Sequence, residues 1–243
     1  MSGLKIAALY GFRPNALGLC GPKELPRQQI LKEFLAGKIS HSQILSVMRQ
    51  FRGAYPYYEL IARKNKVKTG AFNKKVVEAY WIGNELLDKV SATDLRKMVV
   101  SQFSGPGLLS KKEAIKKAGA IPENSKPHHS FHVLVIGSVT GSVDFTGNTK
   151  LKDLCRVGWG RVKKLKVKSG KLKVIVEYQP LVGEKKIKLG KLQKKEVFWD
   201  REIVSEIKIG DWVSFHWNFV VQKLNEQNIV NLFKYTKDTL DSL

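Results

Sequence analysis

The chain has 243 residues, of which 43% are hydrophobic and 26% are charged, and this composition excludes a fully disordered protein. Its 43 Lys and Arg against 21 Asp and Glu produce a formal net charge of +22. Such an excess indicates an acidic partner, although a solvated lysine surface would look the same. We find neither a run of about 18 apolar residues nor a cleavable leader, so we expect a cytoplasmic protein without membrane insertion.

Residues 24–118 have the pattern of helices. Ser40 or Ser42 is placed to cap one helix, and Asn73 begins an amphipathic helix expected to run to Leu87. Ser91 and Ser110 each begin a sequence typical of a capping box. A Gly-Pro-Gly break at 105–107 separates the last two helices.

The spacing of apolar residues changes from helical to alternating or continuous after residues 122–127, and we expect this segment to be a linker. We expect a strand in the apolar stretch 131–143, and a hairpin over 162–176 whose turn is Ser169-Gly170. Its lysines alternate with apolar residues, which predicts one lysine face. Further strands at 185–189 and 212–221 and a helix at 226–236 complete the prediction. The fold class is therefore α+β, with an all-α domain (1–122) followed by a small OB-like β-barrel domain (123–243).

Cysteine and histidine are the candidate ligands for a metal. The two cysteines, Cys20 and Cys155, are too few for a disulfide framework, and thiols in a reducing compartment suit metal binding or redox chemistry. Three histidines cluster before the predicted strand: His128, His129 and His132. Imidazole nitrogens ligate transition metals, but the spacing matches no zinc motif, and a structural role is the alternative. We find no Walker loop, GxGxxG, GxSxG, HExxH or CxxC motif, so an accessory protein is favoured over an enzyme.

The second half of the chain resembles a known family. The residues that carry the resemblance are Cys155, Gly160-Arg161-Val162, Gly210-Asp211-Trp212-Val213, His216 and Phe219, with Asn225-Glu226-Gln227 beginning a helix. In this order, over about 153–237, they resemble the OB-barrel chaperones of the HypC/HupF type, which act in [NiFe]-hydrogenase maturation.

The resemblance implies a metallochaperone. Members of that family hold iron that carries cyanide and carbon monoxide, together with a scaffold protein, and help to deliver it to the hydrogenase large subunit. Their cysteine corresponds to Cys155 and their histidine to His216. The expected partner is therefore a scaffold or client protein, and the expected cargo is transiently bound iron. Three features depart from the family pattern: Cys155 is internal, Trp159 replaces a proline, and Asn218 replaces a glycine.

The whole chain also resembles an uncharacterised prokaryotic family, through four segments: 10–22, 53–57, 78–84 and 129–133. This second resemblance implies no activity, but it indicates that both halves form one functional unit. We therefore expect that Cys20 and the histidine cluster fold over the barrel and complete a site with Cys155. Separations of more than about 10 Å would exclude such a site, because metal–ligand bonds are about 2.0–2.3 Å long.

The alternative function is nucleic-acid binding by the barrel. Residues 151–195 hold 15 basic and 3 acidic residues, a net charge of +12. OB barrels bind single strands through a basic groove and stacking aromatic side chains. The residues expected to contact phosphates are those of the lysine face: Lys163, Lys164, Lys166, Lys168, Lys171 and Lys173.

Overall fold

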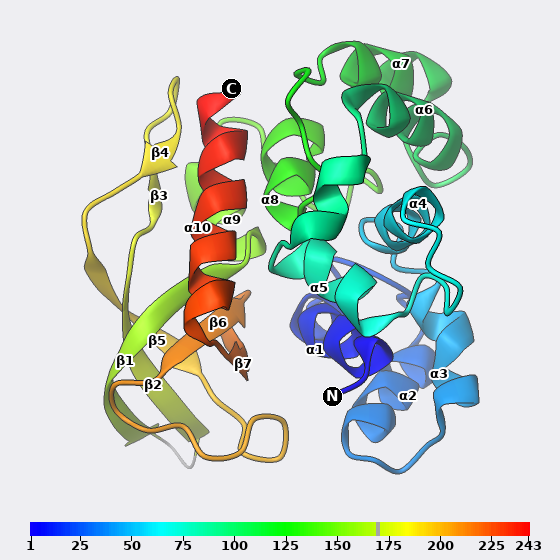
Figure 1. The fold of residues 1–243 in the computed structure, drawn as a ribbon. Helices are drawn as coiled ribbons and strands as arrows, with labels where there is room; N and C mark the ends of the chain where they lie inside the picture. Colours follow the sequence, from blue (N-terminus) through cyan, green and yellow to red (C-terminus); the bar gives the residue numbers. More distant parts are fainter. Residues whose placement is uncertain (169–170) are drawn as a thin grey trace.

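The computed structural model describes residues 1–168 and 171–243, and it joins a helical half to a β-barrel (Figure 1). The helical half comprises α1 (Gly3–Ala16), α2 (Leu25–Leu35), α3 (His41–Met48), α4 (Tyr55–Lys64), α5 (Lys74–Trp81), the 3-10 helix η1 (Glu85–Lys89), α6 (Ala92–Gln102) and α7 (Lys111–Gly119). The capping boxes at Ser40, Ser91 and Ser110 are all present, as is the Asn73 cap. The helix from Asn73 ends at Trp81 rather than Leu87.

The segment between helices and barrel is helical where a strand was expected. Residues 129–136 form α8 (His129–Phe131) and η2 (His132–Ile136), the latter with π-helical turns, and α9 (Thr149–Cys155) follows a loop. The strand prediction for 131–143 is therefore wrong. Its continuous apolar character reflects burial on all sides, because Phe131, Val133, Leu134 and Ile136 are all buried.

The barrel is closed and has five strands. They are β1 (Gly158–Lys168), β2 (Lys171–Tyr178), β5 (Gln193–Phe198), β6 (Trp212–His216) and β7 (Phe219–Lys223), in the order β1-β2-β5-β7-β6. All neighbours are antiparallel except β5 and β7. A five-stranded barrel of this kind confirms the predicted OB-like architecture and the α+β class. A separate pair, β3 (Leu181–Val182) and β4 (Lys188–Leu189), lies outside it.

Two details of the barrel differ from the sequence prediction. The single strand expected at 212–221 is the β6–β7 hairpin, which turns at Trp217-Asn218 with both residues at positive φ. The predicted 162–176 hairpin is confirmed as β1–β2, but a register shift between Val162 and Lys164 interrupts the alternation of its faces. The predicted Ser169-Gly170 turn lies outside the described residues.

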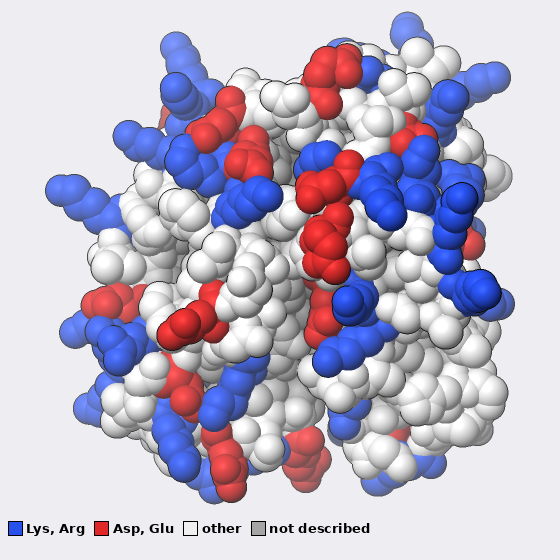
Figure 2. Space-filling view, viewed as in Figure 1, with Lys and Arg blue, Asp and Glu red and all other residues white. Residues whose placement is uncertain are grey.

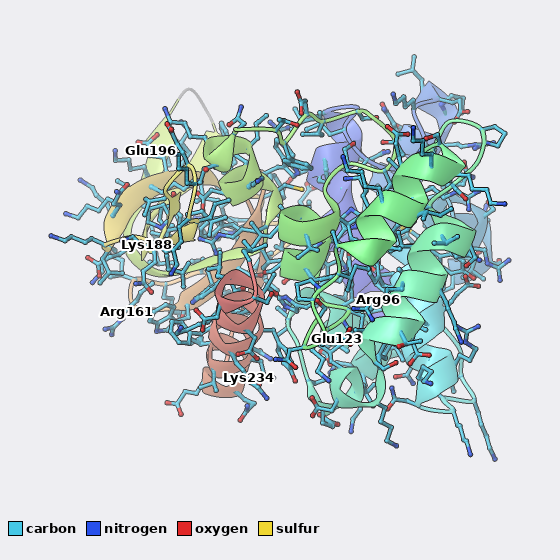
Figure 3. All side chains as sticks on the ribbon, turned by 90° about the horizontal axis from the view of Figure 1, so that it is seen from above. Arg96, Glu123, Arg161, Lys188, Glu196 and Lys234 are labelled. Atoms are coloured by element: carbon cyan, nitrogen blue, oxygen red, sulfur yellow. The ribbon has the colours of Figure 1, made fainter. Side chains whose placement is uncertain are left out.

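The two halves share one hydrophobic core. The largest cluster of buried residues combines the helices with Val157, Trp159 and Val221 of the barrel half. A second cluster fills the barrel. The final helix, α10 (Glu226–Asp241), lies between barrel and helices and contributes Leu232 and Tyr235 to the shared core (Figures 1 and 3).

The connection between the halves is packed against the helices. Arg96 of α6 donates to the carbonyl oxygen of Ile121 and forms an ion pair with Glu123, at 2.6 Å in both cases (Figure 3). None of the helices in the described part of the chain has the length and apolar character needed to cross a membrane.

Candidate metal centre

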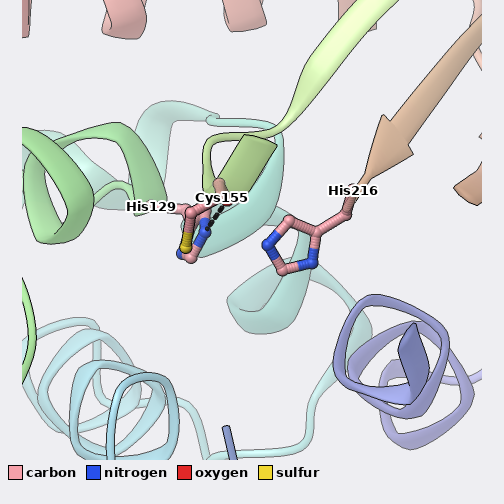
Figure 4. Close-up of side chains that lie close together, drawn as sticks. All are labelled: His129, Cys155 and His216. Carbon is pink, nitrogen blue, oxygen red and sulfur yellow. Dashed lines mark hydrogen bonds between the residues drawn. The ribbon is translucent and has the colours of Figure 1, made fainter. Parts of the chain in front are cut away.

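A cavity of about 100 Å³ lies where the two halves meet. Its lining includes five of the sequence-predicted candidates, which come from four separate parts of the chain: Cys20, His129, His132, Cys155 and His216. One ligand atom from each of His129, Cys155 and His216 lies within 4.8 Å of the others (Figure 4). The fold therefore assembles a Cys/His₂ group from segments far apart in sequence.

His216 directs a free nitrogen into this group. It is the last residue of β6, and its Nδ1 lies 2.8 Å from the carbonyl oxygen of Tyr10 in α1. Since a carbonyl only accepts, Nδ1 carries the proton and Nε2 holds a lone pair. Nε2 is buried and has no partner among the described residues. Burial lowers the pKa of His216 to about 4, so the ring is neutral at pH 7 and able to ligate.

His129 is held in a similar way from the other side. Its Nε2 lies 2.8 Å from the carbonyl oxygen of Cys155, and its Nδ1 lies 2.9 Å from the hydroxyl of Tyr80. That hydroxyl also donates to the carbonyl of Gly53. The neutral ring has one N–H, which donates to the carbonyl of Cys155, and the Tyr80 hydroxyl has one proton, which it donates to the carbonyl of Gly53. No proton is left for the contact between Tyr80 and Nδ1, so the lone pair of Nδ1 has no donor. Burial keeps the ring neutral by lowering the pKa of His129 well below its ordinary value.

Both imidazoles thus have the arrangement usual for metal ligands. A ligating histidine normally donates its other N–H to a carboxylate or a backbone carbonyl, and this contact fixes the tautomer and the ring orientation. Here the carbonyls of Tyr10 and Cys155 fulfil that role. The stacked rings of Tyr10 and Trp81, 4.5 Å apart, border the two histidines and limit their movement.

Cys155 supplies the sulfur at the end of α9. It is a free cysteine, and burial raises the pKa of its thiol well above the ordinary value, with an opposing effect from the Trp217 indole. A thiol of this kind is a poor nucleophile at pH 7, which argues against cysteine-type hydrolysis. A bound metal ion would displace the proton, as thiol ligands require.

A buried ion pair fixes the backbone on both sides of Cys155. Arg156 and Asp153 are 1% and 7% exposed and lie 3.0 Å apart. Asp153 also accepts from the Tyr178 hydroxyl at 3.0 Å and from the Leu181 backbone N–H at 2.9 Å. This clamp of Asp153 and Arg156 joins α9 to β2 and β3, so it fixes the end of α9, where Cys155 lies.

The other predicted ligands occupy different positions. Cys20, whose pKa burial raises to about 11, and His132 line the same cavity outside the close group. The Nδ1 of His132 lies 3.1 Å from the Tyr57 hydroxyl. His128 does not line the cavity: its Nδ1 accepts from the backbone N–H of Ser130, and its ring stacks on Tyr235.

Among the predicted phosphate-binding lysines whose side chains the structure describes, three form ion pairs. Lys163 pairs with Glu177 at 2.9 Å, and Lys166 and Lys173 share Glu196 at 2.9 and 3.1 Å. Lys164 is exposed, and the side chains of Lys168 and Lys171 lie outside the described part. Glu196 is on the outer side of the barrel, away from the cavity (Figure 3).

Sequence reasoning missed the residues that support the ligands. Tyr80 and Trp81 lie within the segment 78–84, already noted as a family motif, but no metal-binding pattern marks them. The spacing of Asp153 and Arg156 around Cys155 is a weak signal, because opposite charges three apart are common on helices.

The comparisons with known proteins assign a family and no activity. No curated protein and no solved structure matches the chain, so the resemblance to hydrogenase chaperones gains no support from them. One family model, of a family of unknown function, matches residues 1–243. The chain therefore belongs to the family of unknown function DUF6390.

Proposed function

We propose that this protein binds one transition-metal ion through His129, Cys155 and His216. The observation that carries the proposal is the buried Nε2 of His216, which has no partner among the described residues and belongs to a group of three ligand residues whose ligand atoms lie within 4.8 Å of one another. A tetrahedral ion with bonds of about 2.0–2.3 Å separates its ligand atoms by about 3.3–3.8 Å. Closure by about 1 Å would therefore complete the group. Thiolate and imidazole donors favour zinc, copper, nickel or iron over magnesium or calcium.

Cys20 is the fourth ligand in this proposal. It lines the same small cavity, and the backbone N–H groups of Gly21 and Gly53 beside its sulfur favour the thiolate by lowering its pKa. No carboxylate is among the described residues that line the cavity. Two thiolates would neutralise a divalent ion, which a buried site needs because an uncompensated charge is costly there.

The more specific form of the proposal is a metallochaperone for hydrogenase maturation, with iron as cargo. The HypC/HupF resemblance supports it, since that family's cysteine and histidine correspond to Cys155 and His216, which lie together at the cavity. Its test is an affinity purification from the native host without oxygen, comparing wild type with Cys155→Ala. Recovery of maturation factors together with loss of iron in the variant supports this form, and recovery of unrelated partners at unchanged iron content refutes it.

Metal binding itself is tested by titrating the metal-free protein with Co²⁺ under anaerobic conditions. We expect one ion per chain, the visible bands of tetrahedral cobalt and a thiolate-to-cobalt charge-transfer band in the near ultraviolet. His216→Gln should abolish the visible bands, whereas His41→Gln, an exposed control, should retain them. Cys155→Ser and Cys20→Ser should each weaken the charge-transfer band. Binding that survives in both His216→Gln and Cys155→Ser would refute the site.

A further inference from the structure

A second hollow lies on the helical half, and it is basic. It is a groove of about 770 Å³ between α3, α4, the segment after α4 and α6. Its charged lining consists of five cations, Arg49, Arg63, Lys66, Lys68 and Lys97, and one carboxylate, Glu59. The groove shares no lining residue with the metal cavity, so it is an independent feature.

The cations of this groove are available for a ligand. All five are exposed, and none forms an ion pair among the residues that the structure describes. This distinguishes them from the β1–β2 hairpin, where Glu177 and Glu196 hold three lysines. In the view of Figure 2, basic side chains extend towards both edges, and acidic side chains lie in a central band and also among the basic ones on the left side.

Local helix chemistry does not explain the whole group. Arg63 is in the last turn of α4, where a cation stabilises the helix dipole. Arg49, at the C-cap of α3, is favoured in the same way, but Lys97 belongs to the middle of α6, where the dipole gives it no such role. Cations from separate elements therefore converge on one groove despite their mutual repulsion, which a bound polyanion would relieve.

We propose that this groove binds the phosphodiester backbone of single-stranded nucleic acid. A basic channel beside an aromatic surface is the usual design for such binding. Here the half-buried Tyr55 lines the groove and stacks on Phe72, with ring centroids 5.5 Å apart. The overall charge of +22 adds long-range attraction for a polyanion. An acidic peptide is the competing ligand, but its carboxylates would not use an aromatic platform.

The salt dependence of the proposed binding can be estimated. The five cations and Glu59 leave a net charge of +4, and each phosphate contact contributes about −0.7 to the slope of log K against log salt for a single strand. About four contacts predict a slope of about −2.8, so affinity should fall about 50-fold between about 50 and 200 mM salt.

The test uses fluorescence anisotropy of the full chain with short labelled oligouridylate and oligothymidylate, and with a glutamate peptide of equal charge. Arg63→Gln/Lys97→Gln should reduce the salt slope by about 1.4 and weaken binding to both oligonucleotides. The matched control, Lys111→Gln/Lys112→Gln on α7, should behave as wild type, and the hairpin variant Lys164→Gln/Lys166→Gln tests the competing lysine face. Absence of binding, a loss confined to the hairpin variant, or equal affinity for the peptide would each overturn the proposal. Circular dichroism should confirm that the variants are folded.

Discussion

Removing the Asp153 carboxylate tests how the site is held. In Asp153→Ala, the Arg156 guanidinium, 1% exposed, loses its buried counterion. The Tyr178 hydroxyl and the Leu181 N–H lose their acceptor as well, and Lys195, 3.6 Å from the carboxylate, loses its ion pair. Burial already lowers the pKa of Arg156, and Asp153 is the main group that opposes this effect.

Breaking a buried pair from one side costs about 3–5 kcal/mol, because the remaining charge has no compensation. For a chain of this size that lowers Tm by on the order of 10 °C. The assays are urea unfolding and thermal melting of the metal-free protein. Glu184→Ala, which removes an exposed carboxylate, should change the free energy of unfolding by less than about 0.5 kcal/mol.

A double variant separates the ion pair from other effects. Asp153→Leu/Arg156→Met removes both charges of the pair and leaves only the more exposed Lys195 without its partner, so it should recover part of the stability lost in Asp153→Ala. If Asp153→Ala costs less than about 1 kcal/mol, or if the double variant is less stable than the single one, the clamp does not act as an ion pair.

Two other predictions follow from packing and burial. A Cβ at Gly158 would overlap the Phe215 ring, so Gly158→Ala should destabilise the barrel by about 1–3 kcal/mol. The control Gly119→Ala, where a Cβ meets open space at the end of α7, should be neutral or stabilising. Equal urea midpoints for the two variants would contradict this prediction. Burial lowers the pKa of His132 to about 3, so its neutral form is favoured in the folded state and no stability is lost above pH 6.5. Below pH 6.5 the unfolded state takes up the proton, and His132 should cost the folded protein about 1.4 kcal/mol per pH unit, a contribution that His132→Gln should subtract from the slope of stability against pH between pH 6.5 and 5, while the other buried histidines, His128, His129 and His216, supply the remainder. An unchanged slope in the variant would show that His132 does not titrate on unfolding.

Local sequence signals predicted much of the fold. Helix caps depend on residues within one turn, so they can be recognised without tertiary information, as at Asn73, Ser91 and Ser110. The β1–β2 hairpin was likewise legible from alternating residues on both sides of a short turn.

Elements without such signals were missed. Helix α1 is buried on nearly all sides and contains Pro14, so it shows no amphipathic period. The β6–β7 turn uses Trp217 and Asn218 at positive φ, where a glycine would have marked a hairpin.

The candidate site was predicted in its residues and not in its geometry. Sequence alone identified Cys155, His216 and the histidine cluster, but it could not show that His129 and not His128 meets the other two. That choice depends on helix α8, which directs His128 to Tyr235 and His129 to the cavity. Side-chain direction in a short buried helix follows from tertiary packing.

The most direct test of the central claim is X-ray absorption spectroscopy at the edge of whichever metal copurifies with the protein from its host without oxygen. We predict one metal ion per chain, with two imidazole nitrogens at about 2.0–2.1 Å and two sulfurs at about 2.3 Å. The sulfur signal should be reduced in Cys155→Ser. A shell of oxygen atoms only, or a metal content unchanged by both His216→Gln and Cys155→Ser, would contradict the claim that His129, Cys155 and His216 form a metal centre.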